Sequence, residues 1–256
     1  MAFDILAPDY DPAFTTTQIG RWLRGRVHAR LNTLYHAGYQ VLELGCGTGE
    51  DARHLAAQGI HITATDASPE MLKVAAAKNT QTPLATFAPL NLAALPDNDF
   101  TGLYDGVFAS FGVLNCIPDW KPLAAWLAAR VRPGGKIAFG IMSPYCVWEI
   151  MWHGAHLHLR TATRRLRKSA PFQINNSEVM PIYYPTPRRI RRDFAPHFRS
   201  THLEGLGLFL PPSDAFGVIE KRPRLLKTLT LVDHHTSRMR WLAAMADHYW
   251  IEFERV

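Results

Sequence analysis

Three glycines at alternate positions stand between a short apolar run and a helix-like pattern in the segment VLELGCGTGEDARHLAAQG (Val41–Gly59). The apolar run Gln40–Leu44 predicts a buried strand. Because Gly45, Gly47 and Gly49 carry no side chains, the loop after this strand can turn sharply and lie flat against a ligand. The helix that follows offers unpaired N–H groups and the positive end of its dipole. This strand–loop–helix unit predicts an α/β fold with a ligand site at the carboxyl end of the strand.

The rest of the chain repeats the alternation of strands and helices. Apolar and β-branched runs predict further strands at His61–Thr65, Leu84–Pro89, Gly106–Ser110, Lys136–Met142, His202–Leu210 and His248–Phe253. Helical spacing predicts helices at Thr15–Tyr35, Asp51–Gln58, Pro69–Lys78, Trp120–Arg130, Tyr145–Lys168 and Arg188–Phe194. The proline-rich stretch Pro171–Pro187 predicts a loop or a short hairpin. Strands that alternate with helices favour a parallel sheet covered on both faces.

Length and composition favour one α/β domain, because 256 residues that are 47% hydrophobic can bury a sizeable core. The N-terminal stretch MAFDILAPDYDPAF has no basic region and does not predict a signal peptide. The most apolar stretch, Ile137–Trp152, is too short to span a membrane and contains Pro144 and Glu149. The three cysteines lie far apart, at Cys46, Cys116 and Cys146. We therefore expect no disulfides, no metal site and no transmembrane segment, and a cytoplasmic location.

The net charge of +6 is concentrated in two clusters, Arg160–Lys168 and Arg188–Arg192. Basic clusters occur in proteins that bind nucleic acids or anionic lipids, and also on solvated surfaces. No aromatic residues are interleaved with these arginines as in a nucleic-acid-binding module. We interpret the clusters as solvated faces and do not expect a nucleic-acid partner.

The residues around the glycine loop favour a cationic ligand over a dinucleotide. A dinucleotide loop needs a third glycine where this chain has Glu50. Glu43, just before the loop, and Asp51, at the helix start, would repel a pyrophosphate and attract an ammonium group. Asp66 ends the second predicted strand, where an acid can accept both hydroxyls of a ribose. A ribose joined to a cationic amino acid, without phosphate, describes S-adenosylmethionine (SAM).

Five motifs in order resemble those of the class I SAM-dependent methyltransferases, and within them the small-molecule group often called type 11. The motifs are VLELGCGTGEDA, ITATDASPEML, NLAALP, YDGVFASFGVLNCIPD and VRPGGKIAFGIMSP. The resemblance covers about Val41–Pro144, with weaker similarity at APDYDPAF and in the last strands. It implies a doubly wound, mainly parallel, seven-stranded sheet with an N-terminal helical segment and a lid inserted after the fifth strand.

The resemblance also implies how one domain, residues 1–256, is divided. Residues 1–38 would form an N-terminal helical cap, and residues 39–144 the SAM-binding core. Residues 145–187 would form the lid, and residues 188–256 would complete the sheet. We expect a monomer or a homodimer.

The resemblance assigns the SAM-binding residues by their positions in the motifs. Those expected to frame the methionine part are Glu43, Gly45, Gly47 and Gly49, with Cys46 as a small residue between the glycines, and Tyr10 is expected to close over SAM. Those expected at the ribose, the adenine and the sulfonium are Asp66, Ala67, Met71, Asn91, Leu92, Ser110 and Phe111. Asn91 departs from the acid usual at its position, although an amide oxygen can still accept a hydrogen bond from adenine. As alternatives, Asp66 could be a helix N-cap, Asn91 a turn residue and Tyr10 a core aromatic.

Methyl transfer from a sulfonium needs the acceptor held in line with the methyl group, and a general base only if the acceptor starts protonated. His153 and His156, which could share one helix face, are the candidate bases, and His158 and His202 are further ones. Ordinary surface histidines are the alternative. The lid region is rich in aromatic residues, namely Trp148, Trp152, Phe172, Tyr183 and Tyr184. They favour a hydrophobic or aromatic acceptor, or they pack in the core.

We therefore expect a SAM-dependent methyltransferase that acts on an oxygen, nitrogen or carbon atom of a small molecule. An RNA or protein methyltransferase that uses the basic clusters is the first alternative. A non-catalytic SAM-binding protein is the second, and a nicotinamide-dependent oxidoreductase, which the glycine spacing disfavours, is the third.

Overall fold

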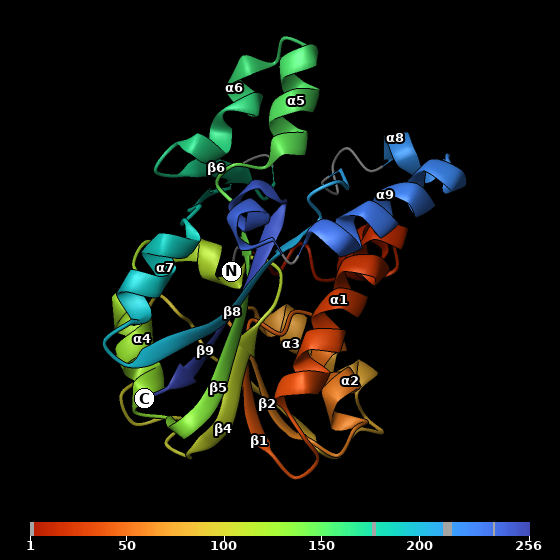
Figure 1. Cartoon of the computed structure of the whole chain (residues 1–256). Helices are drawn as coiled ribbons and strands as arrows, with labels where there is room; N and C mark the ends of the chain where they lie inside the picture. Colours follow the sequence, from red (N-terminus) through yellow and green to blue (C-terminus); the bar gives the residue numbers. More distant parts are fainter. Residues whose placement is uncertain (1–2, 176–177, 212–216, 238) are drawn as a thin grey trace.

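The computed structural model describes residues 3–175, 178–211, 217–237 and 239–256. Seven strands form one sheet in the order β3-β2-β1-β4-β5-β9-β8 (Figure 1). Their bounds are β1 Gln40–Leu44, β2 His61–Asp66, β3 Ala85–Pro89, β4 Tyr104–Ala109, β5 Val131–Met142, β8 Phe198–Leu206 and β9 His248–Arg255. β9 runs antiparallel to both of its neighbours, β5 and β8, whereas β1 to β5 pair in parallel. The predicted doubly wound, mainly parallel, seven-stranded sheet is confirmed.

Helices cover both faces of the sheet. The α-helices are α1 Gln18–Leu34, α2 Glu50–Ala56, α3 Pro69–Lys78, α4 Lys121–Ala128, α5 Val147–Ala155, α6 Leu159–Ala162, α7 Pro187–Phe194, α8 Gly217–Glu220 and α9 Pro223–Thr236. Short turns of other helix types are η1 Asp11–Thr15, η2 Val113–Cys116, η3 Arg164–Leu166 and η4 Arg240–Met245. On one face Val41, Phe108 and neighbouring strand residues pack against α1, α2 and α3. On the other face Leu42, Val107 and their neighbours pack against α4 and α7. This alternation is the two-residue period of strands buried on both faces.

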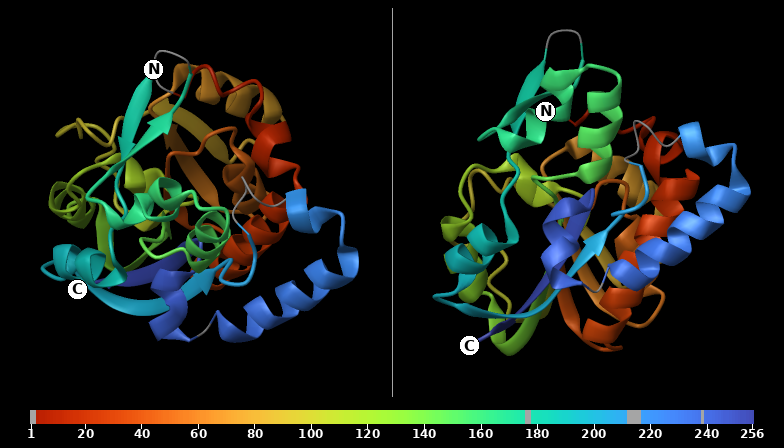
Figure 2. Two further views of the ribbon diagram at one scale, coloured as in Figure 1. Left: turned by 90° about the horizontal axis from the view of Figure 1, so that it is seen from above. Right: turned by 45° about the horizontal axis from the view of Figure 1, so that its top comes forward.

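The segment 145–187, which we call the insertion, rises above the carboxyl edge of the parallel strands (Figures 1 and 2). Its strands β6 Ala170–Gln173 and β7 Val179–Ile182 pair antiparallel, so of the two predicted alternatives, a loop or a short hairpin, the structure shows the hairpin. The single helix predicted over Tyr145–Lys168 is wrong, because the chain forms α5, α6 and η3 instead. Leu157 lies between α5 and α6 with a φ of 60°, which no α-helix allows.

Helix α9 was not predicted from the sequence. It lies beside α1 in both figures, and Leu226 and Leu229 pack against the core on that side. Arg26 of α1 forms an ion pair with the buried Asp233 of α9, with 3.6 Å between Nη1 and Oδ2. Among the described residues, no helix combines the length and the apolar character needed to cross a membrane.

The end of α1 is tied to the centre of the sheet by one side chain. The buried Tyr35 hydroxyl donates a hydrogen bond of 2.8 Å to the carbonyl oxygen of Val107 in β4. This ring occupies the space beside Gly106, where an added Cβ would lie 2.1 Å from Tyr35 Cε1 and 2.8 Å from the carbonyl oxygen of Lys136. Gly106 is therefore required for α1 to pack on β4.

We predict that Gly106→Ala lowers the free energy of unfolding by about 1–3 kcal/mol, because the ring of Tyr35 or strand β5 must move. Gly25→Ala is the matched control in α1: it is exposed with no atom within 4 Å, and it should raise stability by about 0.5–1 kcal/mol. Urea unfolding of the two variants measures both values. Equal stabilities would contradict this account of the packing.

Candidate active site

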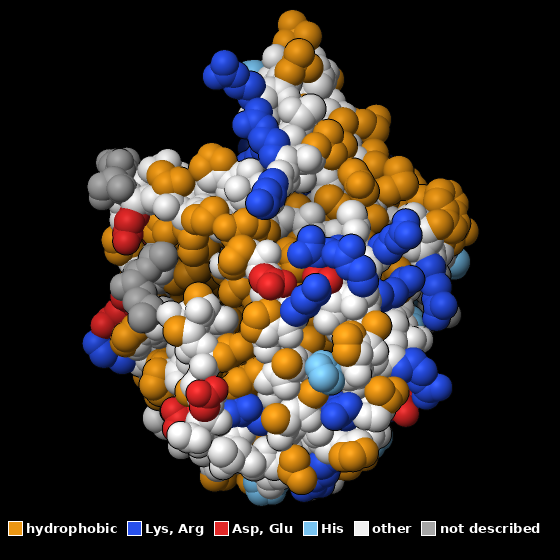
Figure 3. Space-filling view, turned by 90° about the vertical axis from the view of Figure 1, so that its left-hand side faces the viewer, with side chains coloured by type: hydrophobic (Ala, Val, Ile, Leu, Met, Phe, Trp, Pro, Cys, Tyr) orange, Lys and Arg blue, Asp and Glu red, His pale blue; other side chains and the backbone are white. Residues whose placement is uncertain are grey.

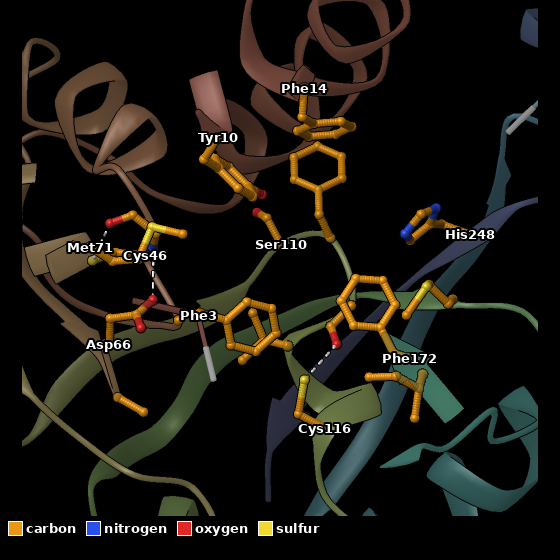
Figure 4. Close-up of a pocket in the computed structure, with 18 of the residues that line it drawn as sticks. Phe3, Tyr10, Phe14, Cys46, Asp66, Met71, Ser110, Cys116, Phe172 and His248 are labelled. Carbon is orange, nitrogen blue, oxygen red and sulfur yellow. Dashed lines mark hydrogen bonds between the residues drawn. The ribbon is translucent and has the colours of Figure 1, made fainter. Parts of the chain in front are cut away.

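A cavity of about 590 Å³ opens at the carboxyl edge of the parallel strands. It is lined by the N-terminal segment, by the loops after β1 to β5, by the insertion and by the start of β9. Figure 4 shows Asp66 and Met71 on one side of this cavity and His248 and Phe172 on the opposite side. Because β9 is antiparallel, its first residues reach the same edge as the last residues of the parallel strands.

The glycines of the loop have different surroundings. Gly47 has a φ of 52°, and an added Cβ would meet only the Tyr10 ring, at 3.9 Å, so its open face belongs to the cavity. An added Cβ at Gly49 would instead lie 2.8 Å from Asn79 Nδ2 and 2.9 Å from Ala75 Cβ. Gly49 does not line the cavity; it lets α2 pack closely on α3.

Asp66 lines the cavity at the end of β2. Its carboxylate accepts hydrogen bonds of 2.9 Å from the N–H groups of Gly47 and Ser68. Burial raises the pKa of Asp66, which these N–H groups only partly oppose. The N-cap of α3 is Ser68, whose hydroxyl accepts from Met71 N at 3.2 Å, so the carboxylate of Asp66 is not needed for capping.

Glu43 lies beneath the loop and does not line the cavity, since it is 1% exposed. Burial raises the pKa of Glu43 well above its usual range, and the nearby Asp51 adds to the rise while Arg24 opposes it. In the part of the chain that the structure describes, Glu43 Oε2 and the buried Ser110 Oγ have no hydrogen-bond partner. Both are buried polar atoms that a ligand or a water molecule can satisfy.

Arg24 of α1 is a cavity residue that the sequence analysis missed. Its Nη1 lies 2.5 Å from Asp51 Oδ1, and its guanidinium lies 5.0 Å from the centre of the Phe111 ring. The available signal was its place beside Leu23 and Val27 on the apolar face of α1, where an arginine must find a buried partner.

The N-terminal segment is fastened to the glycine loop. Asp11 accepts a hydrogen bond of 2.7 Å from Thr48 Oγ1 and pairs with Lys78 Nζ at 2.7 Å. This contact holds Tyr10 against the open face of Gly47, so Tyr10 lines the cavity as expected, together with Phe3.

Most of the other residues expected at SAM also line the cavity, namely Gly45, Cys46, Ala67, Met71, Asn91, Leu92, Ser110 and Phe111. Asn91 also has its alternative role, because its side-chain oxygen accepts from Ala93 N at 2.9 Å within a turn. Burial raises the pKa of Cys46 well above its usual range, so its thiol stays protonated.

Phe111 lines the cavity between the ring of Phe14 and that of His248. It has a φ of 51°, uncommon for a residue with a side chain, and its ring centre lies 5.1 Å from Phe14 and 6.2 Å from His248. We call the part beyond Phe111 the acceptor half. Its lining residues are Cys116, Met142, Arg164, Arg165, Pro171, Phe172, Ile182, Tyr184, Asp247 and His248.

The histidines predicted as bases are not at this site. His153 and His156 belong to the end of α5, outside the cavity lining, and His156 Nδ1 instead contacts the carbonyl oxygen of Trp152 at 2.7 Å. That prediction is corrected because α5 extends away from the sheet edge (Figure 1). Of the lid aromatics, Phe172 and Tyr184 line the cavity, whereas Trp148, Trp152 and Tyr183 do not.

The basic clusters are only partly solvated. Arg165 is buried, and its guanidinium pairs with Glu149 at 2.9 Å and with Asp247 at 2.8 Å. In α7, Arg189 and Arg192 both pair with the buried Asp193. Figure 3 shows other lysine and arginine side chains exposed over this side of the molecule and up the insertion. Only part of each basic cluster therefore forms the solvated face that was expected from the sequence.

Comparison with known proteins gives the family. Residues 42–137 match a family model described as a methyltransferase domain. A demethylmenaquinone methyltransferase from Renibacterium salmoninarum is 32% identical over 188 residues, 71% of each chain. Another from Clavibacter sepedonicus is 32% identical over 135 residues, and the match spans about half of each chain, 53% of this one and 54% of the relative.

Solved structures agree on the fold. A structure described as a SAM-dependent methyltransferase from Listeria monocytogenes aligns with a TM-score of 0.65 at 16% identity, over 91% of this chain and 98% of the other. With the seven-stranded order and the matched motifs, these findings confirm the predicted family: the chain belongs to the class I SAM-dependent methyltransferases.

Proposed function

We propose that this chain transfers a methyl group from SAM to a hydrophobic, aromatic small molecule. One observation carries the proposal: a single cavity joins the open face of Gly47 and the Asp66 carboxylate to an apolar acceptor half. A cofactor and an acceptor can therefore meet beside Phe111 without either leaving the protein interior.

The residues present suit SAM. Asp66 offers a carboxylate for ribose hydroxyls, and Ser110 lines the cavity with an Oγ that has no hydrogen-bond partner among the described residues. Glu43 lies beneath the loop, outside the cavity lining. The acidic character set by Glu43, Asp51 and Asp66 favours a cationic ligand and opposes a phosphate. Arg24 lines the same region, and its Nε has no hydrogen-bond partner among the described residues, so it can receive the carboxylate of the methionine part.

The family resemblance assigns the remaining contacts, and the residues that it names line the cavity. Ala67 and Met71 would flank the adenine, Asn91 and Leu92 would lie at its edge, and Tyr10 would close over SAM. When bound, SAM supplies a methyl group activated by a sulfonium. The protein positions the acceptor and excludes water, and the aromatic rings of Phe14 and Phe111 shield the region between the two halves.

The acceptor half favours an uncharged aromatic or quinone-like molecule. Met142, Phe172 and Ile182 give it apolar walls. Its buried arginine, Arg165, is already paired with Glu149 and Asp247, so its charge is neutralised within the protein and does not favour an anionic acceptor. The names of the two curated relatives, demethylmenaquinone methyltransferases, are consistent with an acceptor of this class.

The polymer-methyltransferase alternative loses support because several arginines of the basic clusters are occupied within the protein. Arg165, Arg189 and Arg192 all pair with acidic residues. A non-catalytic SAM-binding protein is distinguished from an enzyme by turnover alone. A cytoplasmic location and a monomeric or homodimeric state remain predictions.

The proposal is tested with methyl-labelled SAM, the purified chain and extracts that contain metabolites and lipid-soluble quinones. We expect label in a hydrophobic small molecule, and none with heat-denatured protein. Label found only in RNA or protein would contradict the proposal, as would tight SAM binding without transfer to any fraction.

Asp66→Ala should weaken SAM binding at least tenfold, about 1.4 kcal/mol, because the carboxylate that accepts from the ribose is lost. Asp97→Ala, which removes an exposed acid outside the cavity, is the control and should leave the affinity within twofold. Isothermal titration calorimetry measures both. Unchanged affinity in Asp66→Ala would refute the assignment of the ribose site.

Glu43→Gln should affect stability and binding in opposite directions. At neutral pH it removes a buried carboxyl group whose raised pKa costs the folded state stability, because the same group ionises freely in the unfolded chain, so the free energy of unfolding should rise by about 1 kcal/mol. SAM should bind about fivefold more weakly, about 1 kcal/mol, because the variant lacks the carboxyl group that can ionise near its ammonium group.

The stability gain should shrink as the pH is lowered through the raised pKa of Glu43, since the wild-type side chain then becomes neutral too. Glu70→Gln, on the exposed start of α3, is the control for a surface acid. Urea unfolding at several pH values and calorimetry give both readouts. Loss of stability together with unchanged SAM affinity would show that Glu43 is only structural.

A further inference from the structure

His248 and Asp247 form a hydrogen-bonded pair in the acceptor half. His248 Nδ1 lies 3.0 Å from Asp247 Oδ2, and both residues line the cavity. Because an ionised carboxylate can only accept, Nδ1 donates to it, and this contact selects the tautomer whose lone pair lies on Nε2. Within the described residues, Nε2 has no hydrogen-bond partner.

The carboxylate of Asp247 is fixed from its other side. Its Oδ1 accepts from Arg165 Nη2 at 2.8 Å, and Arg165 Nε donates to Glu149 at 2.9 Å. Burial alone would raise the pKa of Asp247, but His248 and Arg165 outweigh burial and hold it below its usual range. Asp247 therefore stays ionised and can stabilise a positive charge on the imidazole of His248.

The other titratable groups of the acceptor half are poor proton acceptors. Burial raises the pKa of the Cys116 thiol to about 12, so this thiol stays protonated. Burial also raises the pKa of the Tyr184 hydroxyl. Arg164 and Arg165 are cations already engaged by Glu149. This leaves the imidazole of His248, beside Phe111 and across the cavity from Asp66 (Figure 4).

We propose that His248 is the general base of the proposed methyl transfer, that Asp247 positions it, and that the acceptor carries an ionisable hydroxyl group. This inference rests on the proposed function and deepens it. As the acceptor O–H bond breaks, its proton moves to His248 Nε2. The oxygen forms a bond to the methyl carbon while the carbon–sulfur bond breaks, and that electron pair stays on sulfur. The imidazole later releases the proton to water.

The proposed base lies outside the sequence motifs of the SAM-binding core, and backbone hydrogen bonds at the start of β9 bring it to the cavity. Asp247 and His248 stand where β9 begins, and Asp247 N donates to the carbonyl oxygen of Gly207 at 3.1 Å. Its carbonyl oxygen accepts from Ser143 N, just after β5, at 2.9 Å. Two backbone contacts therefore hold the pair at the carboxyl edge, next to the acceptor and opposite the cofactor loop.

The test uses two phenols of similar size with labelled SAM at pH 8, where 4-nitrophenol is largely ionised and 4-ethylphenol is neutral. His248→Asn keeps an N–H that can donate to Asp247 but removes the base. It should lower kcat for 4-ethylphenol at least 100-fold and for 4-nitrophenol less than fivefold, with the Kd for SAM unchanged. His234→Asn, which replaces an exposed histidine of α9, is the matched control and should change neither rate.

Equal losses for both phenols would show that His248 only shapes the cavity, and no loss for either would show that it is not used. Either result overturns the proposal. A wild-type chain that binds SAM but methylates neither phenol would overturn the hydroxyl acceptor while leaving the proposed function intact. A chain that does not bind SAM would instead refute the proposed function itself.

Discussion

A carboxyl group buried beneath a loop without side chains is the constraint on which the rest of the site depends. Glu43 is inaccessible, one of its oxygens has no partner in the described part of the chain, and Asp51 and Asp66 lie close enough to raise its pKa further. A fold gains nothing from such a group, since burying an uncompensated carboxylate is unfavourable. Arg24 offsets part of the charge from the side of α1, and a cationic ligand over Gly47 would offset more.

The sheet topology connects this loop to the chemistry. Parallel strands bring the ends of β1 and β2 to one edge, and the antiparallel β9 brings Asp247 and His248 to the same edge from the opposite end of the chain. Phe111, held in a left-handed conformation after β4, contacts the ring of Phe14 on one side and lies near the ring of His248 on the other. The insertion then encloses the acceptor half with Phe172 and Tyr184. The glycine loop, the Asp247–His248 pair and the insertion therefore line one cavity, which has room for two molecules.

Local patterns predicted the core well and the periphery poorly. Strand Gln40–Leu44 and helix Pro69–Lys78 have the predicted bounds, because a short apolar run and a Ser-Pro helix start are local signals. The cavity positions of Asp66 and Met71 followed from the motifs. His248 could not be found this way, since only the antiparallel pairing of β9 brings it to the site. His153 was a wrong choice because spacing on a helix does not tell which way the helix points.

The most direct measurement for the central claim is a crystal structure of the chain with S-adenosylhomocysteine, the product that SAM leaves. The account predicts the ribose hydroxyls on the Asp66 carboxylate, the amino-acid part across the open face of Gly47, and the sulfur facing the acceptor half beside Phe111. A ligand bound elsewhere, or one whose ribose turns away from Asp66, would contradict the account.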